Sequence, residues 1–205
     1  MTSVRPLRPT PSKDTPALHA RAMDNLAFIR DTMEAAGSFT AVSGWGMVAI
    51  GVLSIVAAVV ASTQETATAA LGIWLGLAVF SPAIGIWAMV RKARVANMPL
   101  LSGPGRKFVL SFSPPMAVGA LLTLVLFRAG LMEAIPGVWL LLYGTAVVAG
   151  GAFSVKIVPV MGLCFMAAGV IALFSPAAWS PWILGAAFGG LHIGFGIPIA
   201  RRHGG

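Results

Sequence analysis

Six long apolar segments constrain what this chain can fold into. They lie near residues 44–62, 68–90, 108–127, 135–153, 157–174 and 182–200. Each approaches the roughly 20 residues that an α-helix needs to cross the hydrocarbon core of a bilayer. Within that core every backbone N–H and C=O must be paired inside the protein, which favours helices. The sequence therefore predicts an all-α, polytopic membrane protein with six transmembrane helices and the lipid bilayer as its surroundings.

The composition agrees with this fold class. Of the 205 residues, 58% are hydrophobic and only 10% are charged, whereas soluble domains carry about 25% charged residues. The single cysteine, Cys164, excludes an intrachain disulfide.

The distribution of basic residues predicts the orientation in the membrane. The formal net charge is +8, and with six spans only Arg128 among the lysines and arginines falls on the side opposite the termini. Because cytoplasmic loops are enriched in Lys and Arg, we expect both termini in the cytoplasm and the protein in the cell (inner) membrane. Orientation accounts for the basic charge, so no nucleic-acid partner is expected.

The N-terminal region divides into two parts ahead of the transmembrane domain, 44–205. Residues 1–16 are expected to form a disordered basic tail, because four prolines oppose a helix. Residues 17–43 are predicted to form a cytosolic amphipathic helix and a linker. The apolar residues of this helix recur at spacings of four, four, three and four, namely Leu18, Ala22, Leu26, Ile29 and Met33. The helix either lies on the membrane or the bundle, or residues 17–36 dock a second copy or a cytosolic protein partner.

The even-numbered spans share a pattern that predicts three helical hairpins in tandem. Each has a tryptophan near its outer end, Trp74, Trp139 or Trp182, and closes on a basic residue. Membrane interfaces alone place tryptophan and basic residues at opposite helix ends. They do not explain the shared GIW and GVW starts or the glycines in mid-helix.

The stretch VMGLCFMAAGVIALFSPAAWSPWILGAAFGGLHIGFGIPIARR resembles the HdeD-type acid-resistance membrane proteins. The shared features are a glycine that opens the first helix, a proline-containing outer turn and a glycine-rich return helix, and the resemblance covers 44–202. The stretch FIRDTMEAAGSFTAVSGWG is similar to the approach to the first span in small bacterial multi-pass proteins. Both resemblances imply a six-span bacterial inner-membrane protein without established catalytic residues.

Small residues spaced by four mark faces where helices are expected to pack closely. The candidate positions are Gly72, Gly76, Gly185, Gly189, Gly190 and Gly194. A hinge or a broken helix along a substrate path is the alternative. Prolines inside the second and third spans are candidate kinks, at Pro82, Pro114 and Pro115.

His192 is the one ionisable residue expected at membrane depth, and it is the candidate functional polar residue. It shares a helix face with Gly185, Gly189 and Gly196. Ionisable groups within a membrane are functional candidates by default, so proton-linked or ligand-gating work is one interpretation. The other is a neutral structural imidazole bonded to a carbonyl or a hydroxyl; the candidate hydroxyls belong to Ser81, Ser111, Ser113, Thr123, Tyr143 and Thr145. Haem ligation by two histidines would need a second histidine at that depth, and the sequence has none.

The acidic residues argue against an enzyme. All six Asp and Glu lie outside the spans, and no metal, phosphate or dinucleotide motif occurs. We therefore expect no catalytic residue, no metal site and no cofactor. The sequence favours a non-enzymatic membrane protein that acts through helix packing and partner association, for example in a stress response. The alternative is a small-molecule or ion permease or channel, with His192 and the Gly/Pro-interrupted helices lining its path.

Overall fold

The computed structural model describes residues 15–36, 42–95 and 103–203. The chain divides into two units, Met1–Gly37 and Ser38–Gly205. The first contains helix α1, Thr15–Ala36. The sequence predicted a disordered tail over residues 1–16, but the last two of these residues already belong to α1. Residues 1–14 of the expected tail lie outside the described residues.

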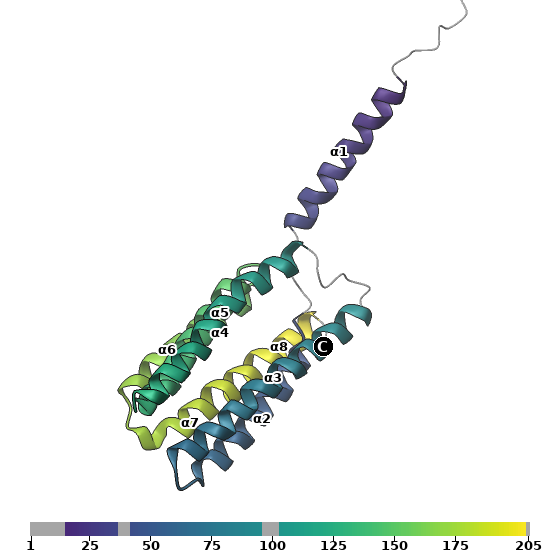
Figure 1. Ribbon diagram of the computed structural model, residues 1–205. Coiled ribbons are helices and arrows are strands. Elements are labelled where there is room, and N and C mark those ends of the chain that lie inside the picture. Colours follow the sequence, from purple (N-terminus) through teal and green to yellow (C-terminus); the bar gives the residue numbers. More distant parts are fainter. Residues whose placement is uncertain (1–14, 37–41, 96–102, 204–205) are drawn as a thin grey trace, which may run out of the picture. The chain divides into compact units, whose positions relative to one another are not determined.

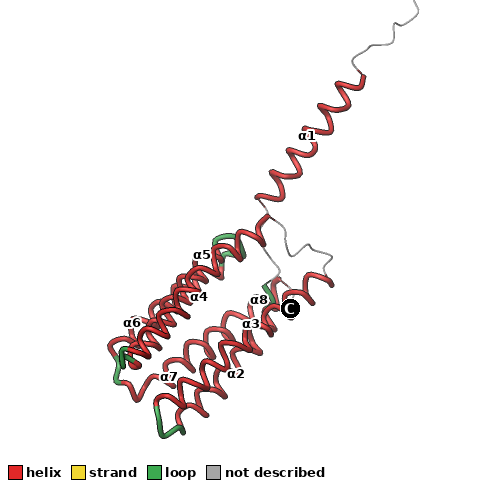
Figure 2. The backbone as a smooth tube through the Cα atoms, viewed as in Figure 1, coloured by secondary structure: helices red, strands yellow, loops and turns green. Residues whose placement is uncertain are grey.

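The second unit contains six helices that are long and apolar enough to cross a membrane, counted over its described residues. They are α2 (Gly44–Ser62), α3 (Ala67–Val95), α4 (Gly103–Arg128), α5 (Ile135–Gly151), α6 (Ile157–Phe174) and a sixth span made of three consecutive pieces. Those pieces are α7 (Ser180–Leu184), the π-helical η3 (Gly185–Leu191) and α8 (His192–His203). No strand occurs among the described residues (Figure 2), so the predicted fold class and the six spans are confirmed.

Local sequence explains several helix ends. The Ser43 side chain accepts a hydrogen bond from the Gly46 N–H at 3.2 Å and caps α2. The Thr66 hydroxyl accepts one from the Ala69 N–H at the start of α3. Gly130 follows α4 with φ +72°, and this left-handed residue ends the helix as glycine commonly does. Short 3-10 turns, η1 (Met132–Ala134) and η2 (Ala177–Trp179), precede α5 and α7.

The six spans form two groups of three (Figure 1). In one group α2 lies between α3 and the sixth span, and in the other α5 lies between α4 and α6. The first two expected hairpins, α2–α3 and α4–α5, are therefore present. The third differs, because α6 packs chiefly on α5 and the sixth span chiefly on α2. The three tryptophans of the proposed repeat also differ, since Trp74 is buried and Trp182 is exposed.

Glycines facing each other explain why these helices choose their partners. At four pairs, a Cβ added to either glycine would come within 3.3 Å of the other's carbonyl oxygen: Gly44–Gly196, Gly51–Gly189, Gly137–Gly169 and Gly144–Gly162. The first two pairs join α2 to the sixth span, and the other two join α5 to α6. Within each helix the paired glycines are seven residues apart, so they share a face of two antiparallel helices. Without a hydrophobic drive between helices in lipid, such close backbone approach is what holds the pairs together.

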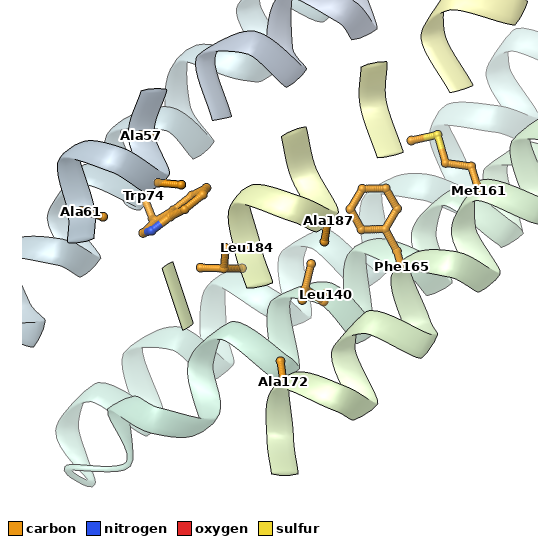
Figure 3. Close-up of a cluster of buried hydrophobic side chains, with 10 residues drawn as sticks. Ala57, Ala61, Trp74, Leu140, Met161, Phe165, Ala172, Leu184 and Ala187 are labelled. Atoms are coloured by element: carbon orange, nitrogen blue, oxygen red, sulfur yellow. The ribbon is translucent and has the colours of Figure 1, made fainter. Parts of the chain in front are cut away.

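The core joins the two groups. Figure 3 shows Trp74 of α3 on one side, Leu184 of the sixth span in the middle, and Leu140 of α5 and Phe165 of α6 on the other. Leu140 and Phe165 are fully buried. The outer helices α3 and α4 instead expose apolar side chains such as Val79, Phe80 and Leu121. Exposed apolar surface of this extent fits contact with lipid, and the chain is a multi-pass integral membrane protein.

Candidate functional site around His192

His192 is buried and both of its ring nitrogens have hydrogen-bond partners. Nδ1 lies 2.8 Å from the carbonyl oxygen of Phe188, and Nε2 lies 2.7 Å from the hydroxyl of Tyr143. A carbonyl oxygen only accepts, so Nδ1 carries the proton and donates it. Nε2 is then the acceptor for the Tyr143 O–H. Both hydrogen-bonding nitrogens of a neutral imidazole are therefore satisfied, and His192 is only 3% exposed.

The local fold of the sixth span sets the position of the ring. The π-helical segment Gly185–Leu191 ends directly before His192, and such segments often occur at functional sites. On the α2 side, a Cβ at Gly51 would lie 3.2 Å from the Cβ of His192. The glycine of α2 therefore lets the histidine backbone approach, while the ring extends toward α5 and α6.

Aromatic rings enclose the imidazole. Phe165 lies 5.4 Å from it and Phe188 lies 6.1 Å from it between ring centroids. Tyr143 contacts both of these phenylalanines, at 4.8 and 5.1 Å, and reaches Phe112 of α4 at 6.0 Å. Such contacts contribute about 0.5–1.5 kcal/mol each beyond the burial of area. The Tyr143–His192 pair therefore lies within a packed aromatic cluster where the two helix groups meet.

Two surface hollows are lined by residues outside this aromatic cluster. One is an apolar groove between α2 and α3, lined among others by Val56, Gly72 and Gly76. The other lies between the α5–α6 turn and α8 and includes Lys156 and Arg202. Neither is lined by His192 or Tyr143. Among the described residues, no buried side-chain nitrogen or oxygen lacks a hydrogen-bond partner, and no three potential metal-ligating side chains gather.

The six predicted packing glycines fall into two classes. A Cβ at Gly185 would meet Ala58 at 2.6 Å, and a Cβ at Gly189 would meet Ile55 at 2.5 Å, so both lie against α2. The remaining four have no atom within 4 Å of an added Cβ, namely Gly72, Gly76, Gly190 and Gly194. Within the described part of the chain these four are not packing positions, which corrects the expectation. Gly190 and Gly194 are exposed, whereas Gly72 and Gly76 line the groove between α2 and α3.

The predicted kink prolines lie in α3 and α4. Pro82 lies within α3, and Pro114 and Pro115 lie within α4, and both helices continue on either side of them. Pro82 and Pro114 are exposed, so they point away from the packed core. A further helical proline, Pro198, lies in α8 near the end of the sixth span.

The search for small residues spaced by four missed other residues that join the helices. Glycines seven residues apart in two spans mark the pairs described above. The Trp139 indole donates to the Thr123 hydroxyl at 2.7 Å and joins α5 to α4. Lys92 is buried and donates to the carbonyl of Val42 at 2.9 Å, which ties the end of α3 to the start of α2.

Comparison with protein-family models, with curated proteins and with solved structures finds no match for this chain. No residue role is therefore transferred from another protein. The comparisons supply no support for the stress response that the sequence analysis gave as an example of this function.

Proposed function

We propose that this protein is a non-enzymatic membrane protein that acts by association, with the six-helix unit as its anchor and α1 as its contact element. One observation carries the choice over a permease. His192 has both nitrogens bonded inside a packed aromatic cluster, whereas a path along this residue needs a water-accessible cavity. The enclosed and fully bonded His192 thus supports a function at the surfaces of the unit.

The surface of α1 supports self-association as the form that this contact takes. Ala22, Leu26, Ile29 and Met33 follow one another at spacings of four, three and four, the seam of a coiled coil. Leu26 and Met33 are exposed by 60% and 70%. The helix carries Arg21 and Asp24 as well as further charges of both signs, so two copies can pair without net repulsion. A second copy of this chain is therefore the partner that we propose.

Deletion of residues 15–36 tests the association. The full-length protein in mild detergent is expected to show the mass of an oligomer by light scattering, and the deletion variant the mass of a monomer. The double variant Leu26→Asp/Met33→Asp should act like the deletion, while Arg21→Gln on the polar side should not. A monomeric full-length protein would overturn the proposal, and so would a deletion variant that keeps the oligomer.

The orientation belongs to the same proposal. Apart from Arg128, the described basic residues of the six-helix unit cluster at the end where α3 finishes and α4 begins, and Arg128, Glu65 and Glu133 lie at the opposite end. By the positive-inside rule that basic end, with both termini, faces the cytoplasm. In intact spheroplasts a protease should therefore leave tags at both termini uncut. Cleavage of either tag without lysis would contradict this orientation.

A permease or channel that uses His192 is the second candidate. One observation favours it, the π-helical segment that ends directly before His192, because such segments frequently occur at functional sites. In that case the Tyr143–His192 bond would have to break to admit water.

A further inference from the structure

The basic end of the six-helix unit carries charge without described acidic partners. Its basic residues are Arg91, Lys92, Arg94, Arg106, Lys107, Lys156, Arg201 and Arg202. Glu65 and Glu133, the two acidic residues of this unit, lie in loops at the opposite end. The basic end therefore has an excess of positive charge that no Asp or Glu side chain of the unit neutralises.

Several of these cations are already engaged elsewhere. Lys92 is bonded to a carbonyl oxygen, Arg91 lies over the Trp87 ring at 5.7 Å, and Lys107 lies over the Phe153 ring at 5.9 Å. Lys156 and Arg202 differ, because they line one hollow together. Both side chains are exposed.

The hollow combines these two charges with an apolar lining. It measures about 460 Å³ and lies between the α5–α6 turn and α8, so it spans the two helix groups. Apart from Ser154 and the two cations, its walls are apolar side chains, those of Val155, Ile157, Pro198 and Ile199. The arginine fork suits a phosphate in two-point contact, and the lysine adds a point charge.

We propose that this hollow binds the headgroup of an anionic phospholipid, with Lys156 and Arg202 on the phosphate and the apolar walls along the start of the acyl chains. Basic pockets between transmembrane helices on the cytoplasmic side take anionic headgroups in this way. A free phosphate ion would leave the four apolar walls without a partner. The lipid would bridge the two helix groups at their basic end, and this site does not depend on self-association through α1.

Native mass spectrometry of the full-length protein tests the site. With equal amounts of phosphatidylglycerol and phosphatidylcholine, the protein is expected to retain the anionic lipid with about 30-fold preference. That figure corresponds to about 1 kcal/mol for each of the two cations. Lys156→Gln/Arg202→Gln should abolish most of the preference. The control Arg94→Gln/Arg106→Gln removes the same charge from the same end, outside the hollow, and should keep it.

Each remaining outcome decides against the site. Equal retention of the two lipids by the unaltered protein would overturn it. An equal loss of preference in both double variants would show a diffuse charge effect in place of a site. Displacement of the lipid by millimolar inorganic phosphate alone would show a free-anion site. Because all four substituted side chains are exposed, the thermal stability of both variants in detergent should stay close to that of the unaltered protein.

Discussion

At the scale of single residues, His192 is a buried polar side chain whose hydrogen-bond partner was only partly predictable from the sequence. Its position within the sixth span and the need for a polar partner were predictable from the sequence, and Tyr143 was one of six candidate hydroxyls. The choice of Tyr143 was not predictable. It depends on α5 and the sixth span meeting across the two helix groups, and on the π-helical segment that sets the direction of the ring. No local pattern encodes either of these.

The Tyr143–His192 bond should be measurable as a coupling energy. Hydrogen bonds between transmembrane helices contribute about 0.6 kcal/mol on average and up to about 1.7. We expect Tyr143→Phe and His192→Phe to be non-additive by an amount in this range, in a double-mutant cycle of detergent-induced unfolding. As a control, the cycle of Tyr143→Phe with Ser54→Ala should be additive, because the Ser54 hydroxyl bonds only within its own helix. Full additivity of the first cycle would mean that the bond does not stabilise the fold.

At the scale of elements, the helix bounds were far easier to predict than the helix partners. The expected span 44–62 coincides with α2, and 157–174 coincides with α6, because apolar runs with polar interruptions encode them locally. In the third hairpin, α6 packs chiefly on α5 and the sixth span chiefly on α2, since chain neighbours need not be the best-matched faces. The glycines of α2 match those of the sixth span, and this match joins residues such as Gly44 and Gly196 that are far apart in the sequence.

Two glycine-to-alanine substitutions test this account of helix pairing. A Cβ at Gly144 would lie 2.6 Å from Met166 and 2.7 Å from the carbonyl oxygen of Gly162, so Gly144→Ala must push α5 and α6 apart. We expect a loss of about 1–3 kcal/mol in the free energy of unfolding. Gly194→Ala is the matched control, because nothing lies within 4 Å of its added Cβ. It should be neutral or slightly stabilising, since alanine favours a helix over glycine. Equal effects of the two substitutions in the same unfolding assay would contradict the role of the glycine pairs.

At the scale of the whole transmembrane unit, the two helix groups meet through side chains that enclose His192 and bond both of its ring nitrogens. Phe165, Phe188 and Tyr143 occupy the space around the imidazole. This packing around His192 supports our proposal that function lies at the surfaces, on α1 and at the basic end of the bundle. The proposed function depends on the claim that His192 lies in a closed, packed core. This claim distinguishes an associating protein from a permease.

Water-edited solid-state NMR of the histidine-labelled protein in lipid bilayers tests that claim most directly. His19 and His203 lie outside the six spans and serve as internal references for contact with water. The packed core predicts that magnetisation from water reaches those two rings rapidly and the His192 ring only slowly, and that His192 shows the neutral form protonated at Nδ1. Rapid transfer from water to the His192 ring, or a proton on Nε2, would contradict the closed core and favour the permease.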